Sequence, residues 1–385
     1  MSEPVSERLL LARATWSRLV EPGDVVAGAL VGALGPIDAL EWLQESGPVS
    51  VLGPDGRARA ALAAAAERWR TRLPSAAPER DVSMLDRIGG RLLVPESEHW
   101  PVGLADLGPA APMCLWVRGA GDAELNRVLL RSVAVVGSRA CTDYGRYVTA
   151  ELAAGLAERG WGVVSGGAYG VDAVAHRAAL AVAGTTVAFL AGGVDRLYPA
   201  GNTDLLREVA RGGALISEVG PGSVPAKVRF LQRNRLIAAV SRATVVVEAA
   251  WRSGALATAR HAAGLLRPVG AVPGPVTSAG SAGCHRLLRE GVAVCVTDAA
   301  EVIELIAPEP APEHRVPSRD GDGLDLQLRR TLDALPLRRP VPDTSIARTA
   351  GLSEREARAA LGRLELSGLA VRVGSGWRRA SRSGA

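Results

Sequence analysis

Seven short apolar runs, separated by longer stretches of mixed polar and apolar residues, occupy the middle of the chain. The runs are rich in valine and alanine, and the stretches between them have the spacing of amphipathic helices. This alternation predicts βαβ units, and strands that are apolar along their whole length indicate a parallel sheet covered on both faces. The predicted strands are residues 132–137, 161–165, 186–191, 214–218, 244–248, 268–272 and 292–296.

Two stretches without apolar periodicity divide the chain into three predicted domains. The stretch of residues 74–80 is short and polar. Residues 307–323 are rich first in proline and then in glycine and aspartate, as is typical of linkers. Residues 1–75 predict a small helical domain of the SAM or helix-hairpin-helix kind, punctuated by Gly-Pro. Residues 81–306 hold the extended Rossmann-like parallel sheet, and residues 324–385 form the third domain.

The third domain has the pattern of a winged helix. A helix, a short helix, a longer helix that starts at Ser353, a strand, a tight turn and a basic strand follow one another. From Leu324 onward the chain has twelve arginines against six acidic residues, whereas the rest is nearly neutral. The longest of these helices nevertheless has equal numbers of arginines and glutamates. Sequence-specific DNA reading, weak nonspecific DNA binding and protein contact therefore all stay open.

Composition narrows the fold and the compartment. With 48% hydrophobic and only 4% aromatic residues, the core favours a Rossmann-like fold over a β-sandwich. The N-terminal sequence lacks a signal pattern, and no apolar run reaches the roughly 18 residues that span a bilayer. Scattered cysteines without a C-x-x-C pair argue against disulfides and zinc, so we expect a soluble cytoplasmic protein without membrane contact. The cysteines are Cys114, Cys141, Cys284 and Cys295.

Glycine-rich loops follow four of the predicted strands. Ligands of open α/β sheets bind at the carboxyl ends of the strands, where glycine lets the backbone approach closely and helix N-termini offer free N–H groups to phosphate. Four such loops on one edge predict an anion-binding crest, although a single loop of this kind is often only a tight turn. The loops are residues 137–145, 165–176, 191–199 and 249–259.

The only lysine of the chain, Lys227, lies three residues before one of its two phenylalanines, Phe230. In a helix these two residues share a face with Asn234. An ammonium suits the backbone of single-stranded nucleic acid, and an aromatic ring suits a base. A phenylalanine packed into the core beside a solvated lysine is the alternative. Three arginines would lie near the rim of this face: Arg229, Arg233 and Arg235.

Catalytic and cofactor motifs are missing from the sequence. It contains no P-loop, no H-E-x-x-H, no G-x-S-x-G and no metal-ligand cluster, so we expect no cofactor and no metal. Asp172 and His176, one helical turn apart, could form an acid/base pair, but a capping aspartate with a packed histidine is favoured. Glu248 ends a strand at the crest, where it could act on a ribose or hold loop N–H groups.

Taken together, these motifs resemble the DNA-processing protein A (DprA or Smf) family over roughly residues 85–306. The matching stretches include V-V-G-S-R, S-G-G-A-Y-G-V-D-A, L-A-G-G-V-D, K-x-x-F-x-x-R-N-R and V-V-V-E-A-x-x-x-S-G-A-L. Tyr169, Leu231 and His285 depart from the pattern: they stand where the family usually has arginine, proline and asparagine. The departures bear on the DNA path and its affinity.

The resemblance implies a protein that is not an enzyme. It would bind single-stranded DNA cooperatively, form a homodimer and help to load the RecA recombinase during natural transformation. The motif match implies the following nucleic-acid-binding residues: Gly137, Ser138, Arg139, Tyr144, Gly145, Ser165, Gly166, Gly167, Lys227, Phe230, Arg233, Asn234, Arg235, Ser253 and Gly254.

Two other functions stay open. A nucleotide-processing enzyme of the lysine-decarboxylase-like phosphoribohydrolase type would share the glycine-rich crest and the strand-end glutamate. Such an enzyme has no need for the lysine and phenylalanine of the 227–235 helix, and this feature separates the two hypotheses. A regulator that works through the winged helix alone is the third possibility.

Overall fold

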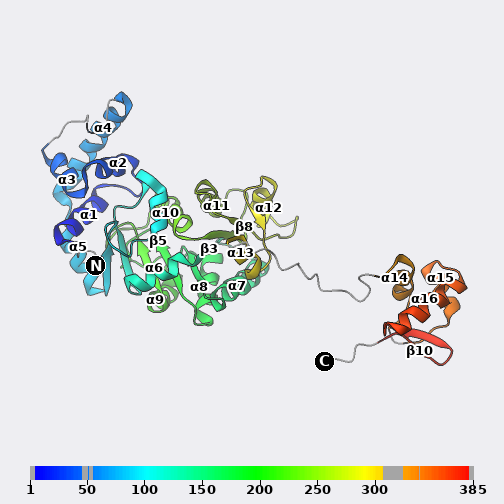
Figure 1. Cartoon of the computed structure of the whole chain (residues 1–385). Helices are drawn as coiled ribbons and strands as arrows, with labels where there is room; N and C mark the ends of the chain where they lie inside the picture. The colour runs from blue at the N-terminus through cyan, green and yellow to red at the C-terminus, as the bar shows by residue number, and fades with distance from the viewer. Residues whose placement is uncertain (1–4, 46–50, 52–54, 307–323, 338, 381–385) are drawn as a thin grey trace. The chain divides into compact units, whose positions relative to one another are not determined.

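A computed structural model describes residues 5–45, 51, 55–306, 324–337 and 339–380. The chain forms two compact units, Met1–Pro308 and Glu309–Ala385. Figure 1 shows the elements of both units in chain order. The predicted linker 307–323 lies outside the described residues.

The first unit begins with five α-helices, of which the first four pack around tryptophan side chains. Ser6, Asp24 and Asp55 cap the first, second and fourth helices with their side chains. Trp16 and Trp69 meet edge to face with ring centroids 5.4 Å apart in the core of these helices. The helices are α1 (Glu7–Leu19), α2 (Val25–Leu34), α3 (Pro36–Gln44), α4 (Gly56–Arg72) and α5 (Pro78–Arg87).

The prediction of a linker at residues 74–80 is corrected by the structure, in which this segment is largely helical. A 3₁₀ turn, η2 (Leu73–Ser75), and the first turn of α5 occupy it. Pro78 stands at the first position of α5, where its missing N–H costs nothing. Within α5, Asp81 forms an ion pair with Arg18, whose Nη2 also donates to the carbonyl of Pro221. The N-terminal helices are therefore anchored to the sheet part of the unit.

A nine-stranded, mostly parallel sheet forms the centre of the first unit. Its order is β1-β2-β6-β5-β4-β3-β7-β8-β9, and all seven predicted strands are present and parallel. Two strands, β1 and β2, were not predicted from the sequence, and they pair antiparallel at one edge. The strands are β1 (Gly90–Leu93), β2 (Leu115–Gly119), β3 (Ser132–Val136), β4 (Gly162–Ser165), β5 (Thr186–Leu190), β6 (Ala214–Ser217), β7 (Ala243–Val246), β8 (Val269–Ala271) and β9 (Val294–Cys295).

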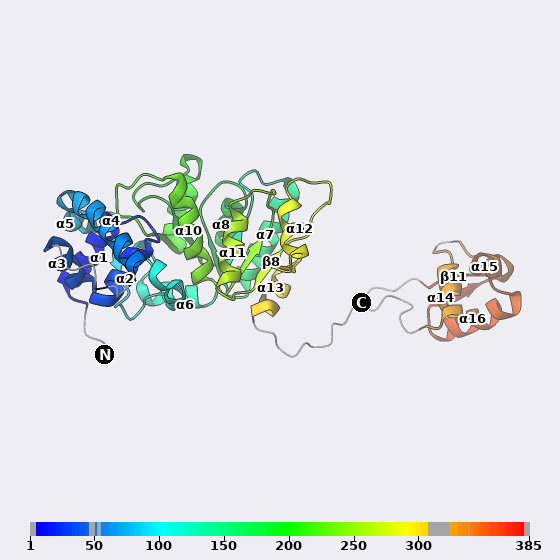
Figure 2. The same cartoon turned by 90° about the horizontal axis from the view of Figure 1, so that it is seen from above.

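Helices cover both faces of this sheet. Val133 and Val135 point to one face, and Ala134 and Val136 point to the other, as the two-residue period of a strand requires. Figures 1 and 2 show the helices in these layers, with α1–α5 at one end of the sheet. One layer contains α6 (Asp122–Leu130), α10 (Lys227–Val240), α11 (Ala255–Gly264) and α12 (Ala282–Arg289), and the other contains α7 (Asp143–Glu158), α8 (Val171–Ala181), α9 (Thr203–Gly212) and α13 (Ala299–Ile306). The connections include η3 (Val102–Ala110) and η4 (Ala200–Asn202).

The order of the strands reverses at β3. From β3 the chain runs outward through β4, β5 and β6 on one side, and then returns to β7, β8 and β9 on the other side. The loops that leave the carboxyl ends of β3 and β7 therefore diverge to opposite faces. Such a reversal opens a crevice, and it is where open α/β sheets bind their ligands.

The second unit consists of three helices and an antiparallel hairpin. Ser353 and Glu356 form a reciprocal capping box at the start of the longest helix, where the sequence predicted a helix to begin. Apolar side chains from all three helices and from the hairpin form one small core. The elements are α14 (Leu326–Asp333), α15 (Asp343–Ala350), α16 (Glu354–Leu366), β10 (Ala370–Val373) and β11 (Gly376–Arg379).

Within the described residues, no single helix is long and apolar enough to cross a membrane. Only α2 and α3 taken together reach the required length and composition, and the pair is bent by 107° at its junction.

Candidate nucleic-acid interface

A cavity of about 290 Å³ opens where the strand order reverses. Its walls come from the end of β3, the loop after β4, one side of α10 and the loop between β7 and α11. Seven of the fifteen predicted site residues lie at this cavity or form its wall. The lining residues include Gly137, Arg139, Asp172, Phe230, Arg233, Asn234, Ser253 and Gly254.

An aromatic ring capped by a guanidinium forms the rim of the cavity. The guanidinium carbon of Arg139 lies 5.1 Å from the centroid of the Phe230 ring, and the centroid of the Tyr198 ring lies 5.8 Å from the same point. Phe230 is half-buried, Arg139 and Tyr198 are exposed, and the other phenylalanine, Phe189, is the one buried in the core. A packed core phenylalanine therefore does not describe Phe230.

Lys227 is exposed at the first position of α10, one turn before Phe230. It does not line the cavity itself. No carboxylate lies within ion-pair distance of its ammonium in the described part of the chain. Its charge is thus available to a ligand that continues beyond Phe230.

Arg233 is buried beneath the second glycine-rich loop. Its Nη1 donates to the carbonyl of Phe189 (2.6 Å), and burial, with a smaller effect of nearby Arg139, lowers its pKa to about 10. A Cβ on Gly166 would lie 2.0 Å from this guanidinium, so only glycine leaves room for it. Arg233 therefore supports the loop from below.

Asp172 holds the same loop by its backbone. Its Oδ2 accepts hydrogen bonds from the N–H groups of Gly166 (3.1 Å) and Ala168 (3.3 Å). Burial raises the pKa of Asp172, and the charge of Arg233 opposes that rise. One turn on, the Nδ1 of His176 lies 2.7 Å from Thr186 Oγ1, and burial lowers the pKa of His176 to about 3. The histidine is a neutral packed residue, as favoured, and not half of an acid/base pair.

Two further predicted residues of α10 face different ways. Asn234 lines the cavity, and its Nδ2 donates to the carbonyl of Gly254 (3.3 Å), which ties α10 to the loop after β7. Arg235 does not reach the cavity. It is buried in an ion pair with Glu218 (2.6 Å), whose own pKa is raised by burial and lowered in part by this arginine.

Glu248 closes the base of the crest. Its carboxylate accepts from the backbone N–H of Thr142 (2.9 Å) and from the hydroxyl of Thr142, and its carbonyl accepts from the N–H of Ser138 (2.7 Å). The side chain is buried and holds loop groups, the second of the two roles that the sequence left open. Gly145 packs against this carboxylate, because a Cβ there would lie 2.2 Å from Glu248 Oε2.

The remaining predicted residues lie around the cavity without lining it. The hydroxyl of Tyr144 donates to the carbonyl of Pro273, and the hydroxyl of Ser165 donates to the carbonyl of Val135 (2.7 Å). The carbonyl of Gly167 accepts from Asn202 Nδ2 (3.0 Å). These contacts hold the loops in place, so Tyr144, Ser165 and Gly167 help to shape the site.

Sequence reasoning missed Tyr198 and Leu231. Tyr198 belongs to one of the four glycine-rich loops, and its Tyr-Pro pair is the signal that could have drawn attention to it. Its contact with Phe230 comes from a helix 32 residues further along the chain, which no local pattern reveals. Leu231 was noted only as a departure, yet it lines the cavity and is exposed.

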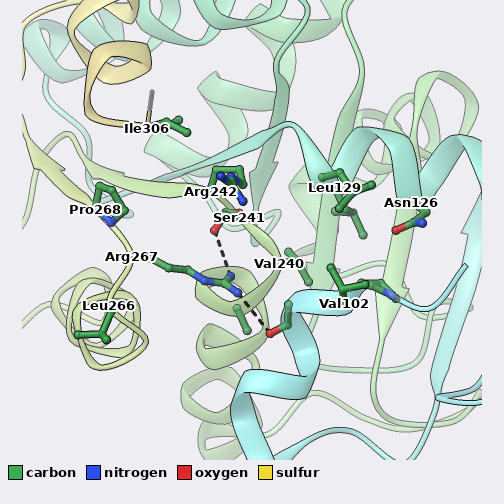
Figure 3. A pocket seen from close by; sticks show the side chains of 14 residues that line it. Val102, Asn126, Leu129, Val240, Ser241, Arg242, Leu266, Arg267, Pro268 and Ile306 are labelled. Carbon is green, nitrogen blue, oxygen red and sulfur yellow. Dashed lines mark hydrogen bonds between the residues drawn. The ribbon is translucent and has the colours of Figure 1, made fainter. Parts of the chain in front are cut away.

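A second cavity, of about 230 Å³, lies at the opposite, amino edge of the sheet (Figure 3). It contains none of the predicted site residues. Arg267 crosses it and donates through Nη1 to the carbonyls of Ala238 (2.8 Å) and Ser241 (3.1 Å), and through Nη2 to Asp106 (2.9 Å). Both terminal nitrogens of this guanidinium therefore already have partners within the protein.

The reversal of strand order and the glycine-rich cavity at that point define an open α/β protein with a candidate ligand site at the switch point. A sequence model of the family described as DNA recombination-mediator protein A matches residues 91–307. The chain belongs to this family, which confirms the resemblance inferred from the motifs.

Named relatives cover most of the chain. A protein from Mycobacterium tuberculosis that carries the name DNA processing protein DprA is 44% identical over 379 residues, which are 95% of this chain and 93% of the relative. Protein Smf of Escherichia coli is 35% identical over 317 residues, 80% of this chain and 83% of the relative.

One solved structure agrees with the fold, and a second is similar in sequence. The X-ray structure of DprA from Streptococcus pneumoniae has a TM-score of 0.60 and 28% identity, and the match covers 78% of this chain and 98% of that one. A structure of DNA processing protein A from Helicobacter pylori, described for its single-stranded DNA binding mode, is 32% identical. It covers 50% of this chain and 86% of that one with a TM-score of 0.46.

Proposed function

We propose that this chain binds single-stranded DNA at the carboxyl-edge cavity and acts as a recombination mediator. The observation that carries the proposal is the exposed Arg139 guanidinium over the half-buried Phe230 ring at the mouth of the cavity. Single strands are held by cations along the backbone and by aromatic rings against the bases, and sequence is not read. Lys227, one turn away, supplies a second exposed cation.

Family membership supports the biological half of the proposal. We infer that the protein protects single strands and helps to load RecA in the cytoplasm, as a homodimer that engages one strand with two sites, and without catalysis of its own. The geometry disfavours the phosphoribohydrolase alternative, because the carboxylate of Glu248 is buried and accepts hydrogen bonds from Thr142.

We further propose that the second unit is a winged helix and that it plays a minor part in DNA binding. Two of the three arginines of α16 are already in ion pairs: Arg358 with Asp343 and Glu354, and Arg363 with Asp325. Few free cations then remain on this helix for a phosphate backbone.

Binding is tested by titrating single-stranded and duplex oligonucleotides at several salt concentrations, without nucleotide or metal. Single strands should bind more tightly, and affinity should fall by about 0.7 log units per decade of salt for each phosphate contacted. Equal affinity for blunt duplex, or a strict requirement for ATP, would refute the proposal.

Substitutions separate the ring from the charge. Phe230→Ala should weaken binding by about 1–3 kcal/mol at every salt concentration, because a stacking surface is lost. Lys227→Ala should also reduce the salt slope by about one contact, and Lys227→Arg tests whether a compact ammonium is needed. If Phe230→Ala unfolds the first unit while Lys227→Ala binds normally, the ring is structural.

The mediator role requires its own assay. Purified protein should speed the assembly of RecA filaments on single strands coated with a single-strand-binding protein, and Phe230→Ala should lose this effect. Light scattering at micromolar concentration should give the mass of a dimer. If the protein binds single strands fully but does not change the rate of RecA filament assembly, it is a DNA-binding protein and the proposed mediator role is wrong.

A further inference from the structure

A second aromatic ring with a guanidinium over it lies at the same edge of the sheet. The Trp251 side chain is 51% exposed, and the guanidinium carbon of Arg286 lies 5.0 Å from its ring centroid. Trp251 comes from the loop after β7 and Arg286 from α12, so two separate segments build the pair. The arrangement repeats that of Phe230 and Arg139.

The surroundings of Trp251 are cationic. Arg286 forms an ion pair with Glu290 (2.6 Å), and the charges of Arg260 and Arg289 also act on that carboxylate and, after the hydrogen bond from Arg286, help to lower its pKa. Arg252, next to Trp251, is exposed. One glutamate is therefore surrounded by three arginines, and no carboxylate lies within ion-pair distance of Arg252, Arg260 or Arg289 among the described residues.

The two ring pairs belong to neighbouring strands. Arg139 follows β3 and Trp251 follows β7, and these strands are paired in parallel, so their loops start about 5 Å apart. Ser253 and Gly254, two and three residues after Trp251, already line the cavity that Phe230 borders. An extended polymer that leaves this cavity along the edge toward β8 meets Trp251 next.

We propose that Trp251 and Arg286 form a second stacking site for a base of the same single strand, with Arg252, Arg260 and Arg289 along its phosphates. The inference rests on the proposed function, because it extends the DNA path from the Phe230 site. A ring with an exposed face, flanked by cations without partners, is what sequence-tolerant binding of single strands requires.

The experiment uses the full chain and oligothymidylates from about three to about twelve nucleotides. Trp251→Ala should weaken binding of the longer oligonucleotides by about 5- to 100-fold and leave that of the shortest unchanged, whereas Phe230→Ala should weaken all lengths. Trp251→Phe keeps a ring and should stay within about threefold of the parent. The matched control is Leu266→Ala, because Leu266 is an apolar residue that is 94% exposed at the opposite edge of the sheet. This variant should bind like the parent.

Tryptophan fluorescence gives an independent reading. The other seven tryptophans are buried or half-buried. Single strands should quench the emission of the parent, and Trp251→Ala should lose most of this quenching while it keeps the same thermal unfolding transition.

The outcomes distinguish the two proposals. If the parent and Leu266→Ala bind and Phe230→Ala is impaired, but Trp251→Ala binds every length normally, the second stacking site is wrong and the first stands. If the parent binds no single strand, both fall. If Trp251→Ala changes the oligomeric state in light scattering with unchanged affinity, the ring contacts a second copy of the chain, and the stacking site is again wrong.

Discussion

The two cavities of the first unit lie at opposite edges of one sheet and have similar sizes, about 290 and 230 Å³, but their arginines are in opposite situations. At the amino edge, the guanidinium of Arg267 donates hydrogen bonds to two backbone carbonyls and to a carboxylate. At the carboxyl edge, Arg139 lies over a ring and is exposed. Cavity size therefore does not separate the two cavities, whereas the presence of a cation without a carboxylate partner among the described residues does.

The largest expected effect tests whether the carboxyl-edge loops are built as one unit. Gly170 has φ 76°, and a Cβ there would lie 2.1 Å from the carbonyl oxygen of Ser138. Gly170→Ala should cost about 3 kcal/mol or more of unfolding free energy, because both the backbone conformation and the contact are unavailable to alanine. Chemical denaturation measures the change.

The matched control lies in another loop at the same edge of the sheet. Gly254 has φ −62°, and a Cβ there meets no atom within 4 Å. Gly254→Ala should change the unfolding free energy by less than about 0.5 kcal/mol. Equal stability of the two variants would show that the loop after β4 adjusts freely and is not held in place by its neighbour.

Replacing each of the two arginines by alanine should give the next effect in size. Arg267→Ala should lower stability by about 2 kcal/mol, because it leaves buried carbonyls without a donor, and should not change affinity for single strands. Arg139→Ala should do the reverse: an affinity loss of about 2 kcal/mol with almost unchanged stability. Paired denaturation curves and DNA titrations measure both. If both variants lose stability alone, the contrast between the cavities is wrong.

The smallest effect concerns pH. Burial depresses the pKa of His176 to about 3, below its ordinary value of 6.5, so the neutral form is favoured in the folded state. Its contribution to stability is therefore complete above pH 6.5 and is lost as pH falls toward 3. Between pH 5.5 and 4.5 the loss should be about 1.4 kcal/mol.

The comparison with His176→Gln isolates this contribution, since carboxylates titrate in the same range and glutamine does not. The parent should lose more stability over that interval than the variant does. Parallel curves for the two proteins would show that His176 takes up a proton in place, and that the loop it underlies is less tightly packed than the structure indicates.

The strands were predictable because burial on both faces leaves a continuous apolar signature, as in residues 132–137. The missed strands β1 and β2 lie at the sheet edge, pair antiparallel and include arginines, so they lack that signature. The sequence also could not predict which side of α10 faces the cavity. Every residue from Arg233 to Val240 is buried, so a helical period cannot distinguish the side with Asn234 from the side with Arg235. Each of the two arginine-capped rings depends on a contact between a loop and a helix that lie far apart in the sequence.

The position of Lys227 has a practical consequence. Because it is the only lysine of the chain and is exposed at the start of α10, an amine-reactive reagent has a single side-chain target, beside the site proposed for DNA. A dye or crosslinker can thus be attached next to the site without first engineering the chain. Protection of that one amine by a bound strand would map the contact at the resolution of a single residue.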